Sequence, residues 1–386
     1  MRQRLDWAKF LSISLLAFAM TQTWAEVYRP AQDSEVIDTL PAGSPTFQSR
    51  TRLISSVQQP FTRVEPEIRT LLAQSYAQGD PRALGQAESL IEPYNKETSP
   101  SVRILRANIL QASHRFDDAK AELQAILKSI PNQPDALLML SSIDLVQGHF
   151  DEARGSCDHL RDMGLLVLRF ACFAQIDAMT GKLQESRDTL LKLKQMNNGL
   201  TTEQQRWINL MLADIALRLN DAVLAKSVFE QLDIETAPSL MARADWLIAH
   251  HEWEKTQRLL ASHTENDSLL LRLVMSEVRL KDPQASAHFK LLSERIRVWN
   301  ERGETAHQRE EAMYALMLRP PEKSLALART NWQKQRETAD VGVYANAALY
   351  AHSRADLQVI QDWIKKTGFE YPRLTQVVAQ ALQAGH

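Results

Sequence analysis

A repeat of about 34 residues constrains this chain more than any other feature. The segment 114–119, HRFDDA, returns as HFDEA at 149–153, so that Ala153 lies 34 positions after Ala119. A third copy, GKLQES at 181–186, ends on Ser186, 33 positions after Ala153. A period of this length is typical of chains built from stacked supersecondary units.

Small residues recur in pairs twelve positions apart within each copy. The pairs are Ala107 with Ala119, Ser141 with Ala153, and Ala174 with Ser186. Two antiparallel helices joined by a short turn approach closely only where the side chains between them are small. Gly is scarce, at 12 of 386 residues, and this composition favours helix over strand. The sequence therefore predicts an all-α fold of helical hairpins.

Taken together, these features resemble the tetratricopeptide repeat (TPR) family. The small pair recurs in phase with an aromatic or apolar residue at the turn, and larger apolar residues such as Leu123 and Ile126 follow it. The resemblance implies a right-handed superhelical solenoid of TPR-like helix-turn-helix repeats. It also implies a concave groove, lined by the first helix of each repeat, in which members of the family hold peptides or partner proteins. The alternative is an ordinary helical bundle whose phasing is accidental.

The repeat pattern extends in both directions from the clearest copies. Further small pairs at the same spacing are Ser75 with Ala87, Ala213 with Ala225, and Ala244 with Thr256, and a last pair, eleven positions apart, is assigned to Ala315 and Ala326. Apolar spacing predicts helices as far as a capping helix over 372–383. We therefore expect a TPR solenoid over 65–263, continued without a linker by degenerate helical repeats over 264–386.

The first 64 residues differ from the repeats. Residues 1–25 combine a positively charged start, an apolar core and small residues near Ala25, the pattern of a secretory signal peptide cleaved at that point. Residues 26–64 are rich in Pro and polar residues, which predicts an extended leader, with the first helix beginning near Pro66. The signal favours bacterial export, so the expected location is the periplasm. The alternative is an uncleaved signal that tethers the chain to the membrane.

Two cysteines, Cys157 and Cys172, remain after the predicted cleavage. Cys157 falls on the second helix of one repeat and Cys172 on the first helix of the next, and those faces pack together in a TPR stack. In an oxidising compartment such a pair favours a structural disulfide. Two free buried thiols are the alternative.

No residue stands out as catalytic, and neither a metal site nor a cofactor is expected. His250 and His251 occupy a predicted turn, where polar residues are common. His307 shares a helix face with Glu311, but the His-Glu-x-x-His pattern of metalloproteases is missing. Nucleophile-elbow, phosphate-loop and Cys-x-x-Cys motifs are also absent from the sequence.

The register of the repeats predicts which residues line the groove. The position after the small residue of each first helix faces inward and is polar throughout, becoming acidic toward the C-terminal units. Candidate binding residues are Asn108, Gln111, Ser142, Gln175, Asp214, Arg218 and Asp245. A polar stripe beside an apolar one suits an extended segment. A merely solvated face is the alternative.

These observations favour a non-enzymatic periplasmic scaffold or assembly factor that binds a protein or peptide partner of the cell envelope in its groove. The net charge of −2 gives no electrostatic reason to bind nucleic acid or an anionic membrane. We expect no stable membrane insertion after signal cleavage. The C-terminal part also resembles segments of uncharacterised exported bacterial TPR proteins. The other hypotheses are a metal-handling protein or enzyme that uses His250, His251 and His307, and a membrane-tethered subunit of an envelope complex.

Overall fold

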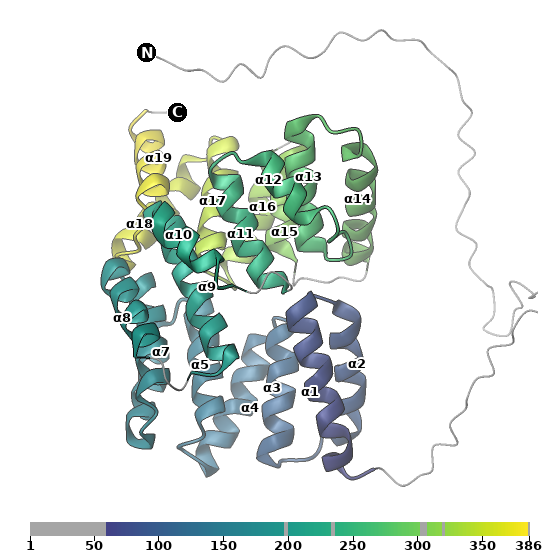
Figure 1. Ribbon diagram of the computed structural model, residues 1–386, viewed down its shortest axis with the longest axis vertical. Helices are drawn as coiled ribbons and strands as arrows, with labels where there is room; N and C mark the ends of the chain where they lie inside the picture. The colour runs from purple at the N-terminus through teal and green to yellow at the C-terminus, as the bar shows by residue number, and fades with distance from the viewer. Residues whose placement is uncertain (1–58, 197–199, 233–235, 302–306, 319–320, 385–386) are drawn as a thin grey trace, which may run out of the picture. The chain divides into compact units, whose positions relative to one another are not determined.

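The computed structural model describes residues 59–196, 200–232, 236–301, 307–318 and 321–384 (Figure 1). Over these ranges the chain forms nineteen α-helices and no β-strand, which confirms the predicted all-α class. The predicted signal peptide at 1–25 and nearly all of the predicted leader lie outside the described residues.

Consecutive helices pack as hairpins, and neighbouring hairpins pack on one another (Figure 1). The pairs are α1 (Phe61–Gln78) with α2 (Pro81–Ile91), α3 (Pro100–Ala112) with α4 (Phe116–Ser129), α5 (Pro134–Gln147) with α6 (Phe150–Asp158), α7 (Leu166–Met179) with α8 (Leu183–Gln195), α9 (Thr202–Leu219) with α10 (Ala222–Phe229), α11 (Ala237–Ala249) with α12 (Trp253–Leu260), α13 (Asp267–Leu280) with α14 (Ala285–Glu301), α15 (Gln308–Leu318) with α16 (Pro321–Trp332), and α17 (Thr338–Tyr350) with α18 (Arg354–Thr367). The last helix, α19 (Pro372–Gln383), packs on α17 and α18. This packing of adjacent pairs is consistent with the predicted solenoid.

The first helix starts earlier than the sequence suggested. It begins at Phe61 rather than near Pro66. Phe61 is buried and packs edge-on against the ring of Tyr94, whose hydroxyl donates to the carbonyl of Gln59 at 2.7 Å. This tertiary contact extends the helix by about one turn on the N-terminal side of Pro66, its predicted start.

The small pairs lie where the two helices of a hairpin meet. Ala107, Ala119 and Ala153 are fully buried, and the other pairs of the central units are nearly so. The prediction that Ala326 is the small buried residue of α16 is wrong, because Ala326 is exposed. Ser324 is buried in its place. Its hydroxyl donates to the carbonyl of Ala312, twelve positions earlier, at 2.8 Å.

Most hairpin turns contain one residue in the left-handed backbone region, which closes the first helix. These residues are Gly79, His114, Gly148, Gly181, Asn220, His251, Lys281 and His352. The turn between α15 and α16 lies outside the described residues. The recurrence of one backbone conformation at equivalent turns shows that the hairpins share a common geometry.

Cys157 and Cys172 lie at disulfide distance, with their Cα atoms 5.8 Å apart. The bond joins α6 to α7, consecutive hairpins, as the sequence predicted. Both cysteines are buried, and the Ser141 hydroxyl lies 3.2 Å from the sulfur of Cys157. The disulfide therefore links one hairpin covalently to the next.

Turns of the hairpins α1–α10 also contact loops that belong to the hairpins α11–α18 and to α19. The contacts join residues between 153 and 221 positions apart: Asn266 to the carbonyl of Gln78, Gln335 to His114, Arg336 to the carbonyl of Gln147, the amide of Leu183 to Glu370, and Arg373 to Asn220. Three of these contacts cap the end of a helix, since they satisfy backbone groups that the helix itself leaves unpaired. Long-range capping therefore links the early and late hairpins.

Candidate functional site

The predicted groove residues lie on first helices of successive hairpins. Their positions in the fold are Asn108 and Gln111 on α3, Ser142 on α5, Gln175 on α7, Asp214 and Arg218 on α9, and Asp245 on α11. All except Arg218 are half-buried, so part of each side chain remains open to solvent. We call the surface formed by these first helices the first-helix face.

Arg218 differs from the other predicted residues because its side chain is buried, with 1% of its surface exposed. Its guanidinium donates to the carbonyl of Ala178 at 2.5 Å and to Asp214 Oδ2 at 3.1 Å. It also donates through Nε to the carbonyl of Glu370 at 2.9 Å, and it lies 4.4 Å from the ring centre of Phe369. The sequence predicts Arg218 as the single cation of the groove, but the loop between α18 and α19 covers it.

Asp214 and Asp245 are each held by an arginine while keeping part of their surface open. Asp245 accepts two hydrogen bonds from Arg272, at 2.6 and 2.9 Å, and its side chain is 33% exposed. Asp214 is 35% exposed and accepts from Arg218 and from the hydroxyl of Thr338. Charge-assisted bonds of this kind fix the carboxylates in place without removing them from solvent.

Sequence reasoning missed the acidic residues that α15 and α17 add to this face. Arg309 pairs with Glu337 at 3.2 Å, with Asp340 at 3.5 Å and with Glu310 at 3.4 Å. Glu337 and Asp340 form a reciprocal capping box at the start of α17. In the sequence these residues carry only the signal of a helix start, since acids favour the first turn of a helix. Their convergence on Arg309 depends on how the hairpins pack.

Burial acts on the acids of this cluster in different ways. It raises the pKa of Asp340, and Arg309 counters this shift only in part. Burial also opposes ionisation of Glu310, but Arg309 and Arg272 together hold the pKa of Glu310 below its usual value. The side chain of Glu337 is 48% exposed. A positively charged group would interact favourably with this exposed carboxylate.

The histidines proposed for metal binding have structural contacts instead. The ring of His250 stacks on Trp246, with Nδ1 at 2.8 Å from the Trp246 carbonyl and Nε2 at 2.8 Å from Asn220 Oδ1. His251 is the left-handed residue of its turn, and His307 stacks on Trp299. Within the described ranges, no group of three or more His, Cys, Asp or Glu side chains could hold a metal ion.

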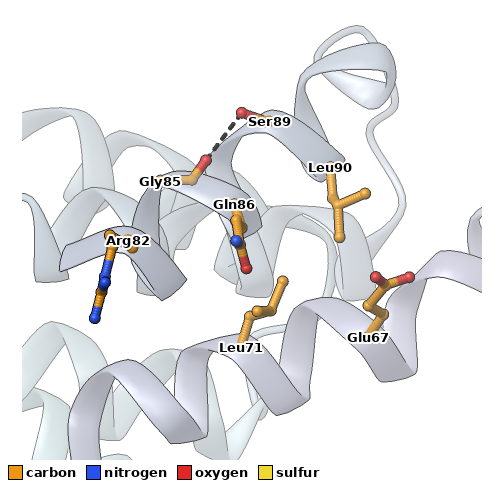
Figure 2. A pocket seen from close by; sticks show the side chains of 7 residues that line it. All are labelled: Glu67, Leu71, Arg82, Gly85, Gln86, Ser89 and Leu90. Atoms are coloured by element: carbon orange, nitrogen blue, oxygen red, sulfur yellow. Dashed lines mark hydrogen bonds between the residues drawn. The ribbon is translucent and has the colours of Figure 1, made fainter. Parts of the chain in front are cut away.

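Two shallow pockets lie away from this charged cluster. The first is a groove on the opening hairpin, and Figure 2 shows Glu67 and Leu71 on α1 opposite Gln86 and Leu90 on α2. The second lies over α4, α5 and α6, with Leu127, Leu137 and Leu140 in its lining. The first-helix face, where charge and partial exposure combine, is the better candidate site.

No protein-family model matches the chain, and no curated protein matches it significantly. The TPR resemblance therefore depends on the period of the sequence and on its small-residue pairs. Across the described ranges, no helix is both long enough and apolar enough to cross a membrane.

Proposed function

We propose that this chain is a non-enzymatic TPR-type scaffold or assembly factor that holds a protein or peptide partner on its first-helix face. One observation carries the proposal. Asp214, Asp245 and Glu337 come from three different hairpins, lie in one charged cluster, and keep 35%, 33% and 48% of their side chains exposed. Carboxylates that are oriented by arginines but still open suit recognition of an extended segment.

The chemistry of the face supports binding rather than catalysis. Its acids pair with Arg218, Arg272 and Arg309, and these bonds position charge but create no activated nucleophile. We place the protein in the periplasm, because residues 1–25 have the pattern of a signal peptide and a disulfide fits an oxidising compartment. Export would appear as loss of about the first 25 residues from the mature mass.

Site-specific photo-crosslinking tests the proposal. A photoreactive residue at Gln175, half-buried on α7, should capture a discrete partner in cells that express the protein. The photoreactive residue placed at Gln184, which is exposed on α8 of the same hairpin, is the matched control and should capture no discrete partner.

Neutralising the acids then tests the recognition surface. Asp214→Asn combined with Glu337→Gln keeps side-chain shape but removes two charges, and it should lower the Gln175 crosslink severalfold. Substitution by Lys is less suitable, since it would place a second cation beside Arg218 or Arg309. Equal capture by the neutralised and unaltered proteins would rule out the first-helix face as the recognition surface.

A further inference from the structure

We propose that a chain of hydrogen bonds from His114 to Asp340 makes the contact between the early and late hairpins sensitive to acid. The contact holds while His114 is neutral and weakens when its ring takes up a proton. The chain crosses from the turn between α3 and α4 to the end of α16 and the start of α17. This inference concerns the fold and is independent of the identity of any partner.

Two amide side chains join the two titratable ends of the chain. The amide nitrogen of Gln335 lies 2.9 Å from Nδ1 of His114 and 3.4 Å from Oδ1 of Asn331. The amide nitrogen of Asn331 in turn donates to Oδ1 of Asp340 at 2.8 Å. Gln335, Asn331 and Asp340 are each 4% exposed or less. The chain therefore runs through the interior, where a lost hydrogen bond is not readily replaced by water.

The carboxylate of Asp340 fixes the orientation of both amides. It accepts from Asn331 on Oδ1 and from the backbone amide of Glu337 on Oδ2. The side-chain oxygen of Asn331 then faces Gln335, which presents its NH2 group both to this oxygen and to His114. Nδ1 of His114 must therefore accept the last bond, and only a neutral imidazole has an acceptor nitrogen.

This orientation cannot adjust to a protonated ring. A proton on Nδ1 of His114 would place two donors face to face at Gln335. Rotating the amide of Gln335 by half a turn would instead set two acceptors against each other at Asn331. Protonation of His114 thus removes one hydrogen bond of the contact in either arrangement.

The surroundings of His114 also oppose a positive charge on its ring. Arg309 of α15, His307 beside it and Lys334 in the loop after α16 all disfavour the charged form. Glu310 favours it, but Arg309 pairs with Glu310 at 3.4 Å. Burial, followed by Arg309, lowers the pKa of His114 from 6.5 to about 4. The ring is therefore neutral at pH 7 while the contact is intact.

The direction of the pH effect follows from this lowered pKa. An exposed imidazole titrates near 6.5, so protonation favours any state in which the contact is broken. The contact has its full strength above about pH 6.5 and loses strength as the pH falls toward 4. Between pH 7.5 and pH 5, the ratio of broken to intact contact should rise about thirtyfold.

Hydrogen exchange at the neighbouring residue measures this ratio. The backbone amide of Arg336 donates to the carbonyl of Val146 at 2.8 Å, next to the bond between Gln335 and His114. Its protection factor, which is corrected for the pH dependence of exchange itself, should fall about thirtyfold between pH 7.5 and pH 5. His114→Asn removes the imidazole but suits the left-handed backbone of this turn, and its fall should be at least about tenfold smaller.

His352→Asn is the matched control for this measurement. His352 is exposed and has the same left-handed backbone at the turn between α17 and α18. The protection factor of Arg336 should keep its full fall in this variant. An equal fall in His114→Asn and the unaltered protein, or loss of the effect in His352→Asn, would overturn the proposal.

Titration of the ring itself gives a second test, which does not depend on how well His114→Asn preserves the contact. NMR should show a pKa of about 4 for His114 in the unaltered protein. Gln335→Glu offers the ring an acceptor in place of a donor and should raise this pKa to at least 6.5. Gln333→Glu adds the same charge at an exposed position and should leave it unchanged. A pKa near 6.5 in the unaltered protein, or no rise in Gln335→Glu, would contradict the proposal.

Discussion

Small buried side chains set the distance between the two helices of each hairpin. Ala107, Ala119 and Ala153 have no exposed surface, and the spacing of twelve residues identified them without a structure. The same spacing locates Ser324 opposite Ala312. The sequence instead predicts Ala326 as the small residue of this helix, and Ala326 is exposed. Two small residues in one turn cannot be told apart by size alone, since the rotation of the helix decides which of them is buried.

Leucine substitutions in α16 distinguish the two positions. Ser324→Leu should lower the free energy of unfolding by about 2 kcal/mol, because it overfills a packed contact and removes the hydrogen bond to Ala312. Ala326→Leu on the same helix should change it by less than about 0.5 kcal/mol. Chemical denaturation followed by circular dichroism measures both. A larger loss for Ala326→Leu would contradict the burial described for this helix.

At the level of helices, charged contacts orient one hairpin on the next. Arg329 of α16 makes two hydrogen bonds to Asp356 in the first turn of α18, at 2.6 and 2.7 Å. The same carboxylate accepts from Tyr344 of α17 and from Ser353. The bonds from Arg329 contribute most to lowering the pKa of Asp356 to about 2. One ionised side chain therefore joins three consecutive helices.

Stability should depend on pH through this carboxylate. Because its pKa is lowered by folding, ionised Asp356 stabilises the protein above about pH 4, and this contribution is lost as the pH falls toward 2. The loss should be about 2 kcal/mol. Urea unfolding at pH 5 and at pH 2.5 gives the change in the free energy of unfolding between these two pH values. This change should be smaller in Asp356→Asn than in the unaltered protein, by the amount just given. Asp362→Asn, at an exposed position of the same helix, should retain the full effect.

At the level of the whole described chain, capping contacts bring the late hairpins onto the early ones. The backbone amide of Arg336 donates to the carbonyl of Val146 at 2.8 Å, and its guanidinium donates to the carbonyl of Gln147 at 2.6 Å. Next to it, the side chain of Gln335 bonds to His114, whose pKa burial lowers to about 4. The first contact satisfies a carbonyl at the end of α5 with a group 189 positions later in the chain. The second joins the turn between α3 and α4 to a side chain 221 positions later.

Hydrogen exchange can measure how firmly this contact holds. Arg336→Ala removes the guanidinium bond to Gln147 and should speed exchange of the backbone amide at position 336 by about tenfold. Amides inside α16 should exchange at unchanged rates. Gln333→Ala, an exposed position three residues earlier, is the control. Uniformly faster exchange throughout α16 would instead mean that Arg336 stabilises the hairpin itself.

The sequence by itself determined the helical hairpins and their order along the chain. A period of about 34 residues and pairs of small residues are local patterns, and each hairpin is stabilised mainly by contacts with itself and its neighbours. The disulfide was predictable for the same reason, since Cys157 and Cys172 belong to adjacent units. Local spacing was therefore sufficient for the all-α fold and for the disulfide.

Only the tertiary structure decided which inward residues remain open. Arg218 is buried because residues 369 and 370 pack on it. Glu337 and Asp340 join the site because the start of α17 bonds to Asp214 of α9 and to Arg309 of α15. These contacts join residues between 28 and 152 positions apart. A repeat pattern records the spacing within and between neighbouring hairpins, but it contains no information about which distant hairpins meet.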